Sequence, residues 1–406
     1  MTDSSGRTDR RRDLLVNGEA LRVDVTAPRP GGGEKFEPRT PEQARSRLLP
    51  QIRSVIEATR ALQPDLRAAD RLYVEARLLP NYIAASQFPA ALLAQIGAVP
   101  VGSRADRGTH VTRSGERETG ARRLILAVDD SGLDELATLV DRGGRGRTER
   151  QAFDEIRKLD EVSLPAPERI IQGSLEPSAE ATTWEAVLNP AASMGQEPEP
   201  LDEETLSKWF ALVERLGGLV YRDFVRRVGG LTFTPVRISA DVAPEVVRFN
   251  PLRAIRPMPG IRPLPPVGLR SQQRAQAPDN AAPVSDVHKV AVFDGGIDMS
   301  GRSSPFFPVP SIDLTPEPPH QVALAHGTGV TGATMYGLLH PGDKAGPPPL
   351  PVDSYRVFPS PFVPGDLEAY WVLDRIKDTV VNGGYRIVNL SLGPRLAVED
   401  DIEPNR

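Results

Sequence analysis

The sequence predicts an α+β region followed by an α/β domain with a parallel sheet. Strand and helix patterns alternate as strand, helix, strand after residue 286, and this order is typical of parallel strands joined by right-handed crossovers. Residues 71–141 instead follow the order strand, helix, strands, helix, which predicts a small α+β sandwich. Seven prolines between Pro257 and Pro283 separate the two parts and indicate an extended linker.

The length of 406 residues agrees with this division, because about 150 residues per domain corresponds to two or three domains. We expect four parts along the chain. These are a flexible N-terminus at 1–39, an α+β region at 40–256, a proline-rich linker at 257–285 and an α/β domain at 286–406. The α+β region is long enough to hold two small modules.

The first helix is predicted from Thr40 towards Leu62. Thr40 can cap it, and Gln43 can complete a capping box. Pro41 suits the first helical position, whereas Pro50 predicts a bend.

Hydrophobic periodicity predicts the remaining elements of the α+β region. Strands are expected at 71–79, 99–102, 110–114, 122–128, 169–175, 183–188 and 231–239, and helices at 89–96, 131–140 and 202–216. Pro235 lies within the last of these strands and predicts an edge position, because proline cannot donate to a ladder. A turn of helix is expected at 243–249.

Composition excludes several classes of function. The chain has 49 Lys and Arg against 54 Asp and Glu, so its net charge of −5 does not indicate a nucleic-acid or membrane coat. The basic run at 141–150 could contact RNA, but a solvated loop is favoured because no aromatic residues are interleaved with it.

The absence of cysteine excludes disulfides, thiolate metal sites and a cysteine nucleophile. With neither a signal peptide nor an apolar run of about 18 residues, a cytoplasmic protein is expected.

The α/β domain opens on an apolar strand, KVAVF at 289–293, which leads directly into Asp294 and two glycines. An aspartate at the carboxyl end of a buried strand lies where α/β sheets hold their functional groups. An ordinary Asp-Gly turn is the structural alternative for this motif alone.

A histidine follows 32 residues later, in the run AHGTGVTG at 325–332. The small residues predict a helix that packs closely on the sheet, with His326 facing a cleft. If Asp294 accepts a bond from one imidazole nitrogen, the other nitrogen can act as a general base. A helix at 366–381 and a buried strand at 386–394, RIVNLSLGP, complete the alternation.

The motifs VAVFDGGID, AHGTGVTG and IVNLSLG, in this order and spacing, resemble the subtilisin-like serine proteases over Val287–Arg406, about 120 residues. The segment VDSYRVF at 352–358 resembles the strand that follows the histidine helix in that family. The resemblance implies a partial subtilisin-like parallel sheet, with Asp294 as the triad aspartate and His326 as the triad base. It also implies that Ser391, Leu392 and Gly393 bind an extended polypeptide substrate as an added strand.

The sequence departs from the family in one decisive respect. The nucleophile of the family lies in a Gly-Thr-Ser motif after the SLG segment, and no Gly-Thr-Ser occurs in the 406 residues. Ser391 belongs to the substrate segment and cannot replace it. We therefore expect the amino-terminal part of a serine-type endopeptidase, inactive alone. The alternative is a non-catalytic binding or regulatory protein that uses a remnant peptidase fold. Smaller departures are Gly295 for Ser or Thr, Gly329 for a second His and Thr331 for Ala.

No cofactor is expected. The spacing of His320, His326 and His340 matches no zinc pattern, and no acidic loop identifies the structural calcium found in some relatives.

The order of elements at 71–141 is that of the ferredoxin-like modules that serve as propeptides in the family. Cytoplasmic relatives with long upstream regions are sometimes encoded beside an ATPase, so a regulatory ATPase is a second expected partner.

Overall fold

The computed structural model describes most of the chain from residue 38 onward. The described ranges are 38–112, 115–172, 180–191, 199–258, 260–262, 275–300, 303–340, 342–358 and 367–394. Contacts divide the chain into Met1–Pro38 and Arg39–Arg406, and the features below belong to the second unit. The N-terminus expected to be flexible at 1–39 lies almost wholly outside the described residues. No helix among the described residues has the length and apolar character needed to cross a membrane.

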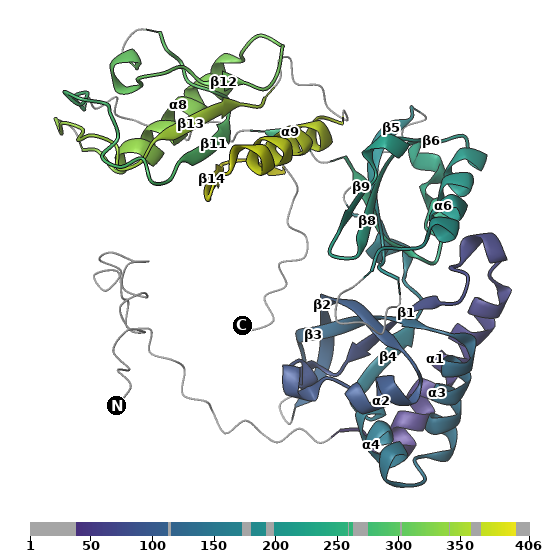
Figure 1. Ribbon diagram of the computed structural model, residues 1–406. Helices are drawn as coiled ribbons and strands as arrows, with labels where there is room; N and C mark the ends of the chain where they lie inside the picture. The colour runs from purple at the N-terminus through teal and green to yellow at the C-terminus, as the bar shows by residue number, and fades with distance from the viewer. Residues whose placement is uncertain are drawn as a thin grey trace, which may run out of the picture. The chain divides into compact units, whose positions relative to one another are not determined.

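The first part of this unit is an antiparallel sheet of four strands in the order β2-β3-β1-β4 (Figure 1). Its strands are β1 (Leu72–Leu78), β2 (Val99–Thr112), β3 (Gly115–Val128) and β4 (Leu159–Ser163). Its helices are α1 (Pro41–Ala61), α2 (Ala90–Gln95), α3 (Asp130–Arg142) and α4 (Arg147–Ile156). Apolar residues of these helices and of the sheet form one core, so the helices cover one sheet face.

Helix α1 begins as its sequence predicts. The Thr40 side chain accepts from the Gln43 N–H, and the Gln43 side chain accepts from the Thr40 N–H. Pro50 lies inside the helix, which continues to Ala61.

Two predictions for this part are wrong. The strands expected at 99–102 and 110–114 are one strand, β2, and β3 begins at Gly115 instead of 122. The distal halves of β2 and β3 pair with each other beyond the end of β1, and their sequences, such as SRADRGT at 103–109 and GERETG at 115–120, carry no alternation of apolar and polar residues. The basic run at 141–150 is not all loop, because α4 begins at Arg147 and buries Ala152 and Ile156 beyond that run.

The second part is an antiparallel sheet of five strands in the order β6-β8-β5-β9, with β7 also paired to β8. Its strands are β5 (Thr182–Leu188), β6 (Leu219–Val220), β7 (Arg226–Val228), β8 (Leu231–Ile238) and β9 (Leu252–Pro257). Its helices are α5 (Pro167–Ile170), α6 (Glu203–Arg215) and α7 (Ala243–Val246). Trp209 of α6 is fully buried in its core and donates to Thr234 Oγ1 at 2.9 Å.

Pro235 does not lie on an edge strand, because β8 has neighbours on both sides. The Pro235 carbonyl accepts from the Tyr221 N–H, so the missing N–H of Pro235 would point to the same side. On that side β6 pairs with 236–237 and β7 with 231–233, which leaves Pro235 opposite the gap between two short strands. The strand expected at 169–175 is also wrong in its described portion, since α5 extends to Ile170.

The C-terminal part is a parallel sheet of four strands in the order β12-β13-β11-β14, as the strand and helix alternation predicts. Its strands are β11 (Val290–Asp294), β12 (Ile312–Asp313), β13 (Val352–Arg356) and β14 (Ile387–Leu390), and its helices are α8 (Gln321–Tyr336) and α9 (Glu368–Gly383). Phe293 and Tyr355 pack with residues of α9, whereas Ser354 bonds Thr331 of α8. Alternate strand residues face opposite sides, so the two helices cover opposite faces.

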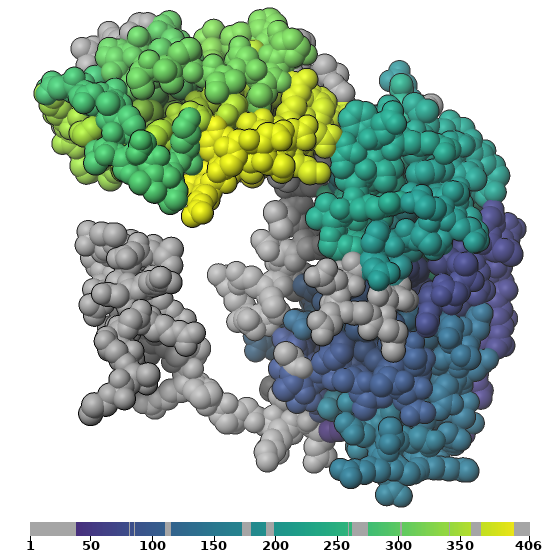
Figure 2. All heavy atoms as spheres, viewed as in Figure 1, coloured from purple at the N-terminus to yellow at the C-terminus, as the bar shows by residue number. Residues whose placement is uncertain are grey.

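Strand β14 is not buried, contrary to its sequence pattern. The exposed fractions are 43% for Ile387, 37% for Val388 and 51% for Leu390. Within the described residues β14 pairs only with β11, so its other edge is open. Residues 367–394, which include β14, reach the molecular surface (yellow in Figure 2).

The predicted linker at 257–285 is not a simple tether in its described residues. Its beginning forms β10 (Ile261–Arg262), which pairs antiparallel with β15 (Gly393–Pro394). Further along, Gln276 makes a parallel bridge to Lys344, and the Val284 N–H donates to the Pro348 carbonyl. Proline-rich sequence indicates extended backbone, but it does not show that this backbone pairs with another segment.

Short 3₁₀ helices are η4 (Pro64–Leu66), η5 (Pro80–Tyr82), η6 (Ala85–Gln87), η7 (Arg222–Phe224), η8 (Ala240–Val242) and η9 (Ser304–Phe306).

One buried amide joins the two antiparallel sheets. The Asn250 side chain accepts from the Tyr73 N–H at 2.7 Å and donates to the Tyr73 carbonyl at 2.8 Å. Asn250→Ala leaves both backbone groups of the fully buried Tyr73 without these partners. We expect the free energy of unfolding to fall by about 2–4 kcal/mol, measured by urea denaturation with tryptophan fluorescence. Asn280→Ala, at an exposed turn, is the control and should leave it unchanged; equal effects would contradict the prediction.

Candidate active site

The site is built on the last residue of β11, a central strand of the parallel sheet. The Asp294 side chain is fully buried, and its Oδ1 accepts from the Gly295 N–H at 2.6 Å. A strand of five buried residues, VAVFD, delivers this carboxylate to the carboxyl edge of the sheet. The position agrees with the expectation that Asp294 lies at the end of a buried strand.

His326 lies in the second turn of α8 and meets Asp294. Its Nδ1 is 2.9 Å from Asp294 Oδ1 and 3.0 Å from Oδ2, and the His326 side chain is 18% exposed. A carboxylate can only accept here, so Nδ1 carries the proton and Nε2 remains the nitrogen available as a base. The structure therefore brings together the two residues whose pairing the sequence predicts.

Three glycines bring α8 close to the turn that follows Asp294. A Cβ at Gly295 would overlap the carbonyl oxygen of Ala323 in α8, and one at Gly327 would overlap backbone atoms of Gly296. Gly296 has a φ of 89°, which favours glycine. Gly295, a departure from the family pattern, is thus required by the close approach of this helix.

Further bonds fasten the turn to α8. The Asp298 N–H donates to Thr328 Oγ1 at 2.8 Å, and Thr328 Oγ1 donates to the Leu324 carbonyl at 2.6 Å. Leu324 and Thr328 lie two residues to either side of His326. Thr328, two residues after His326, is therefore fastened to the turn, and its second bond lies within α8.

Burial sets the protonation behaviour of Asp294. Loss of solvent raises the pKa of its carboxyl group, while the bonds from His326 and from the Gly295 N–H act in the opposite direction. The net direction is upward, so the ionised carboxylate depends on these two donors.

No side-chain hydroxyl bonds His326 among the described residues. Ser391 donates instead to Asn389 Oδ1 at 2.8 Å, and Asn389 lies 3.4 Å from Thr334 Oγ1 of α8. The structure thus brings together Asp294 and His326, but it does not add Ser391 to the pair.

The segment Ser391–Gly393 is bound by another part of the chain. Gly393 and Pro394 form β15, which pairs antiparallel with Ile261 and Arg262 of β10. Beside it lies a pocket of about 740 Å³, whose lining includes Leu390, Leu392 and Tyr370. Of the segment, Gly393 is thus paired with a strand of the same chain, together with Pro394.

Sequence reasoning missed Arg356, the strand neighbour of Asp294. Arg356 is only 4% exposed although it carries a charge, and it ends β13 in register with Asp294. A signal was present in the sequence, since a single arginine stands among the apolar and aromatic residues of YRVF at 355–358.

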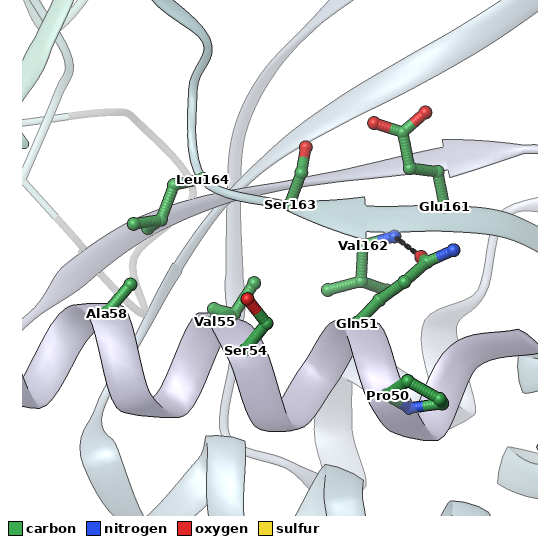
Figure 3. A pocket seen from close by; sticks show the side chains of 9 residues that line it. All are labelled: Pro50, Gln51, Ser54, Val55, Ala58, Glu161, Val162, Ser163 and Leu164. Carbon is green, nitrogen blue, oxygen red and sulfur yellow. Dashed lines mark hydrogen bonds between the residues drawn. The ribbon is translucent and has the colours of Figure 1, made fainter.

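A second hollow lies away from the pair, between α1 and the edge strand β4 (Figure 3). It measures about 570 Å³ and is lined by Pro50, Gln51, Ser54, Val55, Ala58, Glu161, Val162, Ser163 and Leu164. Gln51 Oε1 accepts from the Val162 N–H at 2.9 Å, so a side chain of α1 takes the place of a strand partner. The lining contains no paired base and nucleophile.

Across the described residues, no group of three or more His, Cys, Asp or Glu side chains gathers as a metal site.

No protein-family model matches this sequence, and no curated protein matches it. Among solved structures, the chain titled "Crystal Structure of an Unknown Protein from Galdieria sulphuraria" is similar at 11% identity. That likeness covers 44% of this chain and 87% of the other chain, with a TM-score of 0.14. At this TM-score the likeness carries no argument about fold or function.

The raised pKa of Asp294 predicts a pH dependence of stability. The folded chain holds a proton on this carboxyl group more tightly than the unfolded chain, so stability from this group is present at low pH and lost as pH rises through the folded pKa. In the acidic range above the ordinary aspartate pKa of about 3.9, we expect the stability of the unmodified chain to fall as pH rises, and Asp294→Asn to remove this fall. Urea denaturation of both proteins across that range measures it, and identical slopes would contradict the prediction.

Proposed function

We propose that residues 286–406 belong to a subtilisin-like serine endopeptidase domain, in which His326 is the general base and Asp294 orients it. The observation that carries the proposal is the bond from His326 Nδ1 to the buried Asp294 carboxylate, at the carboxyl edge of a parallel sheet. This pairing fixes the tautomer and supports the imidazolium that forms during acyl transfer.

The proposed chemistry needs a serine hydroxyl that the 406 residues do not supply in a Gly-Thr-Ser motif. His326 Nε2 would take the proton of that hydroxyl while the serine oxygen bonds to the carbonyl carbon of a peptide. The same nitrogen would then give the proton to the departing amine as the C–N bond breaks. Water, deprotonated in the same way, would release the acyl group.

The pairing of β15 supports a polypeptide substrate. Gly393, in the segment expected to bind substrate, already holds an antiparallel neighbour at Arg262. Backbone pairing of this kind supplies affinity without selecting side chains, whereas neighbouring pockets select them. The upstream chain thus occupies an edge that a substrate strand would need.

The topology of the first sheet supports an inhibitory role for the upstream region. Strands and helices follow the order β1, α2, β2, β3, α3, α4, β4, which is that of ferredoxin-like modules with α4 added, and the antiparallel sheet order β4-β1-β3-β2 is also that of such modules. Modules of this kind are the propeptides expected from the family resemblance. A regulatory ATPase remains the second proposed partner of this region.

The alternative is a non-catalytic protein that binds polypeptides through the remnant peptidase fold. The observation that favours it is that no side-chain hydroxyl bonds His326 among the described residues. In that case the β15 edge would bind extended segments without cleaving them.

A fluorophosphonate probe separates the two functions, because it labels only an activated serine. The 406-residue chain should stay unlabelled. If the coding sequence that follows codon 406 encodes a Gly-Thr-Ser motif, the extended protein should be labelled, and His326→Ala should abolish the labelling. Absence of that motif in every reading frame, or labelling that survives His326→Ala, would overturn the peptidase proposal.

The strand pairing can be tested in the present chain. Ile261 is 6% exposed and packs in the apolar core of the C-terminal part, so Ile261→Asp should release β10 from β15. We expect hydrogen exchange at residues 391–394, measured by mass spectrometry, to accelerate about tenfold or more. Val228→Asp is the control, since Val228 lines the same pocket but is 64% exposed. Unchanged exchange in Ile261→Asp would show that β10 does not cover this segment.

A further inference from the structure

We infer that Arg356 is a positioning residue for the Asp294–His326 pair, acting through the segment 311–315 and the turn at Gly295 and Gly296. The inference rests on the proposed function, because the pair matters only if His326 acts as a base. A chain of contacts runs from Arg356 through this segment and the turn to α8.

Arg356 fastens the segment 311–315 to the parallel sheet. Its Nε donates to Asp313 Oδ1 at 2.7 Å, and its Nη2 donates to the Thr315 carbonyl at 2.8 Å. The Arg356 carbonyl also accepts from the Leu314 N–H at 2.9 Å. Two side-chain bonds in different directions need the forked guanidinium, and a lysine cannot reproduce them.

The turn after Asp294 rests on this assembly. A Cβ at Gly296 would lie 2.9 Å from Ser311 Oγ and 3.1 Å from Arg356 Cβ, so the turn contacts both residues. The Ile297 N–H also donates to Ser311 Oγ at 3.2 Å. The position of the turn is therefore set by its contacts with the aliphatic part of the Arg356 side chain and with Ser311, in the segment that Arg356 holds.

The same turn sets the distance between α8 and Asp294. Gly295 lies against the backbone of Ala323, and Gly327 lies against Gly296, with His326 between these two contacts on the helix. Backbone packed on backbone has no side chain that can adjust, so a shift of the turn moves His326 relative to Asp294.

Arg356 is a poor choice for stability alone. Its Nη1 is buried and has no hydrogen-bond partner among the described residues, and a buried unpaired donor costs about 1–3 kcal/mol. Its ionic partner Asp313 has a side chain that is 57% exposed, so loss of Arg356 leaves no buried carboxylate unpaired, the case in which removing one partner is strongly destabilising. A cation retained here in spite of that cost is better explained by the geometry that its fork imposes on the segment 311–315.

The test uses the full chain and observes the pair directly. In protein with isotope-labelled histidine, the Nδ1 proton of His326 should give a low-field NMR resonance that His326→Ala removes. In Arg356→Met we expect this proton to exchange with water about tenfold or more faster, and by more than any lowering of the urea midpoint accounts for. Arg356→Lys should not restore slow exchange, because it lacks the fork.

Arg226→Met is the matched control. Arg226 of β7 also pairs with a carboxylate, Asp374 of α9, but it belongs to the antiparallel sheet and bonds neither the segment 311–315 nor the turn among the described residues. Its exchange rate at His326 should equal that of the unmodified chain. Exchange within about twofold of the unmodified chain in folded Arg356→Met, or acceleration only in proportion to lost global stability, would overturn the inference. If the unmodified chain lacks the low-field resonance, the proposed function fails instead.

Discussion

The buried carboxylate of Asp294 is the constraint on which the C-terminal part depends. An ionised group without solvent needs donors, and here the donors are the N–H of the next residue and the Nδ1 of His326. The first donor requires a tight turn directly after the strand, and the second requires a helix within contact of that turn. The glycines at 295, 296 and 327 meet both requirements, because none of them could carry a side chain without displacing backbone atoms or adopting an unfavourable φ.

The upstream region and the C-terminal part are joined by specific polar contacts as well as by β10. Glu185 of β5 is 6% exposed and accepts from Tyr370 of α9 at 2.8 Å, and its other oxygen accepts from Arg256 of β9. The partnership with Glu185 and burial both raise the pKa of the Tyr370 hydroxyl, so it remains a donor. Because a single buried carboxylate is shared between a tyrosine and an arginine, separating the two parts would leave it incompletely paired.

The edge strands β4, β15 and β14 differ in what pairs with their outer backbone groups. At β4, side chains of α1 bond the outward-facing backbone, with Arg47 donating to the Asp160 carbonyl and Gln51 accepting from the Val162 N–H. At β15, another strand of the same chain is the partner. At β14, apolar side chains are exposed and no partner lies among the described residues. Of these three edges, only that of β14 keeps its backbone groups open to a further strand among the described residues.

By itself, the sequence determined the features that depend on neighbouring residues. These include the capping box at Thr40, the apolar stripe of α6, the parallel order of the C-terminal strands and the residues Asp294 and His326. Only the tertiary structure decided which strand edges are covered, why Pro235 fits an inner strand, and that Gly295 and Arg356 surround the pair. The physical reason is that periodicity records which face of one element is buried. A close backbone approach or an edge partner instead depends on segments far apart in the chain, and a single sequence carries no local signal for that distance.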